Sequence, residues 1–301
     1  MGFSPMAEHF FSGVVCRKCK SDKIKILKTC SICEQCNEKN TISQQDEIMM
    51  FIKSEKPSLL LYADDRQIIP PYEIDIVIPD RAIAIELNGN KFHIESDKKP
   101  ANYHLFKSVS ASKEGYKLIQ IFQDEWIYKK DAVKSYILQC LKIYKKLINH
   151  NHCKVTEISK TEKIKFLKEN HILGDIESDH NIGLVYKDKL VALLPFKKNG
   201  DNILIERFCF KKYTYSEGAM EFMFNYIIET FNIKRIEVIS DLRLETGDTY
   251  QKLGFKICSV IKPKCSYISK ENALLRKQIV FDKTRFEKIF DCGGIKYGIE
   301  V

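Results

Sequence analysis

The feature that most constrains the fold is a pair of short segments, residues 72–78 and 82–88, in which polar and apolar residues alternate. A period of two places every second side chain on the same face of an extended strand. Glu73 and Asp75 therefore share a face of the first segment, and Glu86 and Asn88 share a face of the second. The intervening Pro79-Asp80-Arg81 predicts a short turn. Two such strands side by side bring Asp75 next to Glu86.

This arrangement indicates a metal site. Two carboxylates on neighbouring strands repel each other, and their burial is costly unless a cation compensates. Mg²⁺ (or Mn²⁺) prefers carboxylate oxygens, water and a substrate phosphate as ligands. Such an ion polarises a phosphodiester and activates bound water. We therefore interpret Asp75 and Glu86 as Mg²⁺ ligands; the alternative is a solvent-facing hairpin with exposed acids.

The same region resembles a known family. The run EIDIVIPDRAIAIELNGNKFH (residues 73–93), followed by YHLFK (residues 103–107) and IFQDEW (residues 121–126), resembles phage-encoded homing endonucleases of the PD-(D/E)XK, very-short-patch-repair-like class. The resemblance implies a Mg²⁺-dependent hydrolase that cuts double-stranded DNA at a specific site. It also implies a PD-(D/E)XK core with a mixed sheet flanked by helices, acting in the cytoplasm of a bacterial host.

The resemblance carries individual roles onto this sequence, with two departures. The family's usual lysine position holds Asn88, and Lys107 from the following helix matches the residue that replaces that lysine in some relatives. The auxiliary acid matches Glu73, and the histidine after the Asn-Gly pair matches His93. An acid from a preceding helix matches Glu47. The implied catalytic set is Asp75, Glu86, Glu73, Asn88, His93, Lys107 and Glu47.

Five cysteines gather near the N-terminus. Cys16-Arg-Lys-Cys19 and Cys33-Glu-Gln-Cys36 form two C-x2-C pairs, which together supply the four thiolates of a tetrahedral Zn²⁺ site. Cys30 competes with Cys36 for the fourth position. A segment this short cannot bury a core, so a structural Zn²⁺ would stabilise it as a zinc ribbon. Lys18 and Lys20 beside the cysteines suit phosphate contact.

The C-terminal half predicts a second α/β unit. Tyr250-Gln-Lys-Leu-Gly254-Phe255 resembles the closing motif of the acetyltransferase (GNAT-like) fold. The helix expected from Gly218 would present backbone N–H groups to a phosphate, although the preceding loop has one glycine and the acidic Glu217. DNA recognition or structural packing is the preferred role for this half. Its candidate DNA contacts are Lys211, Lys212 and Arg243.

Bulk composition supports polyanion binding and disfavours a membrane. The net charge is +9, and basic proteins bind nucleic acid through phosphate contacts. No window reaches the roughly 18 apolar residues of a membrane span. The fold class is α/β (α+β) in three parts: a zinc ribbon at 1–42, a nuclease core at 43–150 and a GNAT-like domain at 151–301.

Periodicity predicts elements along the chain. Helices are expected at 46–54, 101–114, 131–148, 160–170 and 218–231. Strands are expected at 72–78, 82–88, 117–122, 181–186, 190–196, 202–210 and 233–240.

Two other functions remain open from the sequence. One is an N-acetyltransferase with a DNA-binding front end, and the other is a DNA-binding protein with a decayed nuclease site, which Asn88 suggests. A single nuclease centre in each chain predicts either nicking or a homodimer that breaks both strands.

Overall fold

The computed structural model describes residues 43–96, 98–271 and 274–301. The chain divides into two compact units, Met1–Leu61 and Tyr62–Val301. The first contains helix α2 (Gln44–Glu55), and the Ser43 side chain caps it by accepting a hydrogen bond from the N–H of Asp46 at 3.1 Å. This confirms the helix expected there. Within the described ranges, no helix combines the length and apolar character that a membrane crossing requires.

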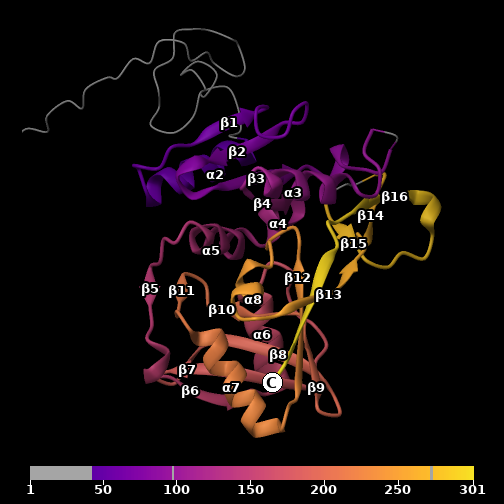
Figure 1. Cartoon of the computed structure of the whole chain (residues 1–301). Coiled ribbons are helices and arrows are strands. Elements are labelled where there is room, and N and C mark those ends of the chain that lie inside the picture. The colour runs from indigo at the N-terminus through magenta and orange to yellow at the C-terminus, as the bar shows by residue number, and fades with distance from the viewer. Residues whose placement is uncertain (1–42, 97, 272–273) are drawn as a thin grey trace, which may run out of the picture. The chain divides into compact units, whose positions relative to one another are not determined.

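The second unit begins with a four-stranded sheet in the order β1-β2-β3-β4 (Figure 1). Its strands are β1 (Tyr62–Asp65), β2 (Ile74–Ile78), β3 (Ile83–Asn88) and β4 (Lys117–Phe122). β1, β2 and β3 are antiparallel, and β4 runs parallel to β3. Ile76 lies opposite Ile85, and continuing this register by one residue places Asp75 opposite Glu86, as the alternation predicts. The pattern does not predict β1, whose four residues include two aspartates.

Both faces of this sheet are covered, which differs from the exposed acidic face considered above. Ala111 of α3 (Tyr103–Lys113) packs against Val77, Ala84 and Leu118. Glu86 is only 5% exposed as a result. The alternation therefore predicts the pairing correctly, while the burial of the polar face follows from a helix packed on that face.

Two helices follow β4, and the second is shorter than predicted. They are α4 (Gln123–Tyr128) and α5 (Lys130–Cys140). The helix expected to continue to residue 148 ends at Cys140, and Lys142 adopts a left-handed conformation with φ 56°. The chain then extends as β5 (Lys146–Leu147), which pairs with β11 (Thr214–Tyr215). These strand hydrogen bonds supply the physical reason for the early helix end.

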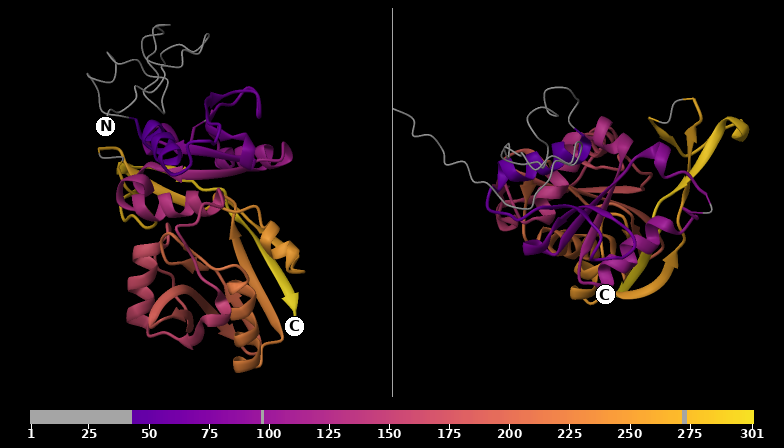
Figure 2. Two further views of the ribbon diagram at one scale, coloured as in Figure 1. Left: turned by 90° about the vertical axis from the view of Figure 1, so that its left-hand side faces the viewer. Right: turned by 90° about the horizontal axis from the view of Figure 1, so that it is seen from above.

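An eight-stranded sheet dominates the rest of the unit. Its path is β13-β17-β12-β9-β8-β7-β6, and β10 also pairs with β8. The strands are β6 (Lys154–Glu157), β7 (His180–Tyr186), β8 (Lys189–Asn199), β9 (Asn202–Ile205), β10 (Cys209–Phe210), β12 (Arg235–Asp241), β13 (Lys256–Ile261) and β17 (Gly294–Glu300). β9 and β12 are the sheet's parallel neighbours. Figure 2 shows the long strand β17 beside β12. The predicted boundary at residue 150 lies between the two sheets, inside the second unit.

Helices cover both faces of this sheet. The apolar face of α7 (Ala219–Phe231) packs on alternate residues of β8, including Ala192, Leu194 and Phe196. Leu193, between them, points to the other face and contacts α6 (Lys160–Asn170). A short helix, α8 (Asp248–Lys252), precedes β13. The helices expected at 160–170 and 218–231 are confirmed.

A small sheet is inserted between β13 and β17 and joins the two larger sheets. Its strands are β14 (Cys265–Ser269), β15 (Arg276–Lys277) and β16 (Phe286–Phe290). Ile268 and Ile289 from this insertion pack on Phe122 of β4. The apolar contact ties the insertion to the first sheet of the same unit.

Candidate active sites

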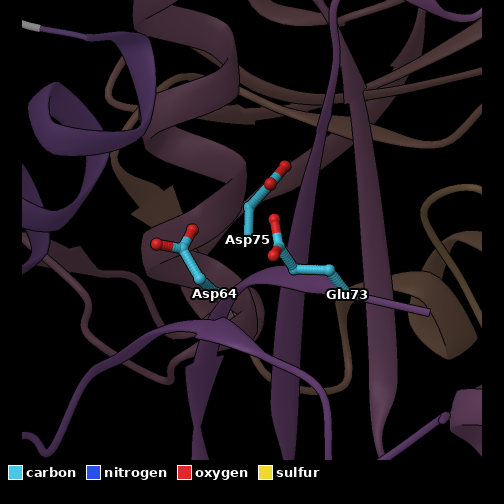
Figure 3. A group of neighbouring side chains, drawn as sticks. All are labelled: Asp64, Glu73 and Asp75. Atoms are coloured by element: carbon cyan, nitrogen blue, oxygen red, sulfur yellow. The ribbon is translucent and has the colours of Figure 1, made fainter. Parts of the chain in front are cut away.

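Three carboxylates cluster at one edge of the first sheet. Asp64 comes from β1, Glu73 from the residue before β2, and Asp75 from β2 itself (Figure 3). One oxygen of each lies within 4.8 Å of the others. The backbone N–H of Leu87 donates to Asp75 at 2.6 Å, and burial raises the pKa of the Asp75 carboxyl. The cluster has the oxygen ligands that a hard cation such as Mg²⁺ uses.

Glu86 stands beside this cluster but has a different partner. Lys107 reaches from α3, pairs with Glu86 Oε1 and donates to the carbonyl of Glu73 at 2.6 Å. Burial and the neighbouring Asp75 raise the pKa of Glu86 to about 7, against the attraction of Lys107. The second oxygen, Oε2, is buried without a hydrogen-bond partner among the described residues. The structure thus brings Asp75, Glu86 and Lys107 together, with Asp64 as a neighbour that the sequence pattern did not indicate.

The remaining residues predicted for this site have distinct positions. Asn88 donates to Gln120 at 3.1 Å inside the sheet, and its own side-chain oxygen is buried without a partner among the described residues. Glu47 lies on α2, in the other unit. The zinc-ribbon prediction for Cys16, Cys19, Cys33 and Cys36, with Lys18 and Lys20, falls outside the described residues.

His93 forms a pair with His104, and the pair's protonation can be derived. His104 Nδ1 lies 2.7 Å from the carbonyl of Phe290, which only accepts, so Nδ1 carries the proton. His104 Nε2 then accepts from His93 Nδ1 at 2.9 Å. Burial lowers the pKa of His93 to about 2 and that of His104 to about 3, which agrees with two neutral rings. His93 Nε2 is therefore left as an acceptor.

The predicted DNA contacts in the C-terminal half differ in accessibility. Lys211 is exposed, and Lys212 lies 3.7 Å from Asp131. Arg243 is only 2% exposed and pairs with Glu125 at 2.8 Å. A buried guanidinium with a carboxylate partner cannot reach a phosphate, so Arg243 has a structural position and not the predicted DNA contact.

A second candidate site is a cavity of about 610 Å³ where the eight-stranded sheet parts. β9 and β12 pair only as far as Ile205 and Val238. Beyond that point β10 stays with β8, while β12 continues along β17 to Asp241. The cavity is lined by α5, the residues after α6, β10, the start of α7, and the segment from Leu244 through α8.

The wall of the cavity at α7 suits an anion. α7 has 13 residues and begins after Gly218, which has φ 73°. The unpaired N–H groups of a helix's first turn attract negative charge. Ser216, just before the helix, lines the cavity, and its hydroxyl has no partner among the described residues. Lys142 and Lys252 add positive charge to the lining, while Glu217 and Glu221 oppose it.

The opposite wall carries acid–base groups. Glu245 and Tyr250 share a hydrogen bond, and both line the cavity. Burial raises the pKa of Glu245, and Lys117 partly offsets the shift. Burial also raises the pKa of Tyr250 well above its ordinary value. Tyr250 belongs to the Tyr-x-x-Leu-Gly-Phe motif noted in the sequence, whereas no sequence signal singled out Glu245.

Comparisons with known proteins support the fold of this half. No family model matches the chain, and no curated protein matches its sequence. Solved structures do match, and each of the following pairs with 50% of this chain. They are the Escherichia coli ribosomal-protein-S18-alanine N-acetyltransferase (10% identity, 94% of its chain, TM-score 0.36), a GNAT family acetyltransferase from Elizabethkingia anophelis with acetyl-CoA bound (12%, 99%, 0.34) and a Bacillus subtilis acetyltransferase in complex with CoA (13%, 99%, 0.32).

These neighbours correct the functional prediction. They are acetyltransferases, so the prediction of a metal-dependent DNA endonuclease, a hydrolase of the homing type, is contradicted. The geometry adds a reason: Lys107 already holds the carboxylate of Glu86, which was expected to bind the catalytic metal. The mixed α/β chain has a GNAT-like fold over about half its length, in the region of the eight-stranded sheet.

Proposed function

We propose that this protein is an N-acetyltransferase that binds an acyl-CoA thioester in the 610 Å³ cavity, behind a DNA-binding front end. One observation carries the proposal: a single cavity joins the start of α7 to the Glu245–Tyr250 pair. The first feature suits the phosphates of a thioester donor, and the second suits proton transfer during acyl transfer.

The donor's phosphates would lie at the first turn of α7. The backbone N–H groups of Met220 and Glu221 follow the Gly218 cap, and the Ser216 hydroxyl adds a donor next to them. Lys142 and Lys252 would contribute cationic contacts. Because Glu217 and Glu221 weaken the positive field, we expect modest affinity that falls with added salt.

The acid–base pair would act on the amine and on the departing thiolate. Glu245, whose pKa is raised, would take a proton from the attacking amine. Tyr250, whose high pKa keeps it protonated, would donate a proton to the thiolate as the thioester carbon–sulfur bond breaks. Transfer of the acyl group to the amine nitrogen then releases the free thiol.

Calorimetry with CoA and a thiol-release assay with acetyl-CoA and a panel of amines test this function. Tyr250→Phe should keep CoA affinity but lose about 100-fold in rate, the usual scale for one acid–base group. Tyr128→Phe changes a tyrosine that is 59% exposed and should leave both quantities unaltered. Absence of measurable CoA binding would refute the proposal.

We also propose that the cysteine-rich segment binds Zn²⁺ and contributes to binding of double-stranded DNA. The two C-x2-C pairs and the chain's net charge of +9 support this. Metal analysis of the purified chain should find one Zn²⁺ that is lost in Cys16→Ser. Replacing Lys18 and Lys20 with Ala should weaken duplex binding and flatten its salt dependence by about one log unit per phosphate contact. An unchanged slope would exclude these lysines from the contact.

A divalent cation is proposed at Asp64, Glu73 and Asp75, without nuclease activity. The three oxygens within 4.8 Å fit a hard cation, and Asp75 belonged to the predicted pair. Lys107 occupies Glu86, so Glu86 would remain outside the ligand set. Mg²⁺ or Mn²⁺ should raise the melting temperature of the wild type and leave that of Asp75→Asn unchanged. Equal shifts in both proteins would reject the site.

A further inference from the structure

One amine of the chain already lies in the proposed acyl-transfer cavity. Lys117, the first residue of β4, lines the cavity together with Tyr136 and Cys140 of α5. Its Nζ lies 3.2 Å from the Tyr136 hydroxyl and 3.4 Å from Cys140 Sγ. The ammonium also lies over the Tyr136 ring, 5.3 Å from the centroid. Lys117 is thus held against a thiol inside the space proposed for an acyl thioester.

The two helical partners are positioned by the fold. Tyr136 and Cys140 are four residues apart, so they lie on one face of α5. Tyr136 donates its hydroxyl hydrogen to the carbonyl of Leu244, which fixes this face above the loop that carries Glu245. The carboxylate of Glu245 and the ammonium of Lys117 attract each other across the cavity.

From this geometry we infer that Lys117 is a site of self-acylation, to which Cys140 relays the acyl group from the thioester donor. The inference rests on the proposed function, because it requires the donor to bind in this cavity. Cysteine exchanges readily with thioesters as the thiolate, and the positive charge of Lys117 stands beside the sulfur. A neighbouring amine then captures the acyl group as an amide, which is more stable than a thioester.

The transfer balances in two steps. In the first, Cys140 Sγ bonds to the acyl carbon, the donor's carbon–sulfur bond breaks, and the Cys140 proton leaves with the donor thiolate as a free thiol. In the second, the Lys117 ammonium gives one proton to Glu245, and Nζ attacks the acyl carbon on Sγ. The new carbon–nitrogen bond displaces Cys140, which takes the second proton from the nitrogen. The overall products are the Lys117 amide, the free donor thiol and one proton.

Acylation removes a positive charge from the cavity. The amide nitrogen keeps one hydrogen, and the acyl group occupies space in which the donor would bind. An anionic donor should therefore bind the acylated chain less tightly than the unmodified chain. The modification would limit itself to one acyl group and lower the activity of the site that produced it.

The test uses the full chain, incubated with acetyl-CoA and analysed by intact mass and peptide mapping. The wild type should gain a single acetyl group on Lys117, and Lys117→Arg should lose that modification. Because Lys117→Arg retains Cys140, it should instead accumulate an acetyl group that hydroxylamine removes. Cys140→Ser should slow the acetylation of Lys117. Lys113→Arg, which changes an exposed lysine on α3, should behave as the wild type.

Parallel calorimetry with CoA separates the two proposals, and melting curves confirm that each variant is folded. If CoA binds and Lys117 stays unmodified, self-acylation is wrong while the proposed function stands. If CoA does not bind, both fall. Acetylation of Lys113 as fast as that of Lys117 would reveal untargeted chemical reaction and would also overturn the inference.

Discussion

At the scale of single residues, the Glu86–Lys107 pair offers a sharp stability test. Both side chains are almost completely buried, with 7% and 2% exposure. Removing the cation leaves a buried carboxylate without its counter-charge, which costs about 3–5 kcal/mol in such sites. We expect Lys107→Met to lower the free energy of unfolding by about this amount at about pH 8, measured by urea denaturation.

The cost should depend on pH in a defined direction. Glu86 has a folded pKa of about 7 against 4.5 in the unfolded chain, so the folded state binds its proton more tightly. This group's contribution to stability therefore rises as pH falls from about 7 to 4.5. Without Lys107 the carboxyl protonates at still higher pH, so the deficit of Lys107→Met should shrink toward about pH 5. A deficit that stays constant with pH would show that lost packing, not charge, is responsible.

Residue-level prediction from the sequence succeeds where local geometry decides. Strand alternation alone places Asp75 opposite Glu86, and the structure agrees. It cannot show that Asp64 joins the cluster, because β1 has no alternating pattern and its pairing depends on a distant contact. The burial of Arg243 was hidden for a similar reason: its partner Glu125 is 118 residues away in sequence.

At the scale of elements, the loop before α8 depends on a glycine. Gly247 has φ +83°, and a Cβ there would lie 1.9 Å from the hydroxyl oxygen of the buried Tyr297. Backbone strain of about 1–2 kcal/mol and overpacking of about 1–3 kcal/mol should both apply to Gly247→Ala. Because the carbonyl of Gly247 accepts from the N–H of Tyr250, CoA binding should also weaken.

Gly115 supplies a matched control for this substitution. Its φ of +81° is nearly the same, and a Cβ there would meet no atom within 4 Å. Gly115→Ala should therefore cost only the backbone strain of about 1–2 kcal/mol and leave CoA binding intact. Thermal unfolding and calorimetry on the two variants isolate the contact with Tyr297. Equal losses of stability would argue against a tight loop at Gly247.

Element prediction fails mainly where strands far apart in sequence impose the conformation. The helix expected over 131–148 stops at Cys140 because residues 146–148 hydrogen-bond to the chain around Tyr213 and Tyr215. The strand expected over 202–210 divides into β9 and β10, and this division opens the cavity. The sequence of residues 131–148 has no Pro or Gly to mark the break. The cavity therefore could not be predicted, although the motif containing Tyr250 pointed to its fold.

At the scale of the whole second unit, a buried charge network joins the sheets. Glu125 accepts from Arg243 at 2.8 Å and from Arg276 at 2.7 Å, and Arg276 also pairs with Asp124 at 2.8 Å. The guanidinium groups of both arginines lie over the ring of Phe122, at 5.3 Å and 3.7 Å from its centroid. The backbone adds a link, because the N–H of Gln120 donates to the carbonyl of Arg243 at 2.8 Å.

The network predicts a stability contribution opposite in sign to that of Glu86 on acidification. Burial pushes the pKa of Glu125 upward, but Arg243 and Arg276 outweigh it, and the net shift is downward from 4.5. A depressed carboxyl pKa gives stability that is present above 4.5 and lost as pH falls through the folded value. Glu125→Gln should therefore remove part of the acid sensitivity of unfolding. The check is a series of melting temperatures below about pH 5, where the wild type should lose stability faster than the variant.

The joint also determines whether the unit unfolds as one body. Arg243→Met leaves Glu125 with one of its two guanidinium partners, and breaking a buried pair costs about 3–5 kcal/mol. Because Arg243 holds the loop that leads to Glu245 and Tyr250, the loss should fall on the contact between the sheets and on CoA binding together. Arg285→Met breaks a surface pair with Glu271 whose side chains are 63% and 73% exposed, and it should cost less than about 1 kcal/mol. Calorimetric unfolding should give a single transition for Tyr62–Val301 in the wild type and in Arg285→Met, and a split or broadened transition in Arg243→Met. If Arg243→Met instead keeps a single sharp transition and full CoA affinity, the apolar contact of Phe122 with Ile268 and Ile289 is sufficient to couple the sheets, and the charge network is not what shapes the cavity.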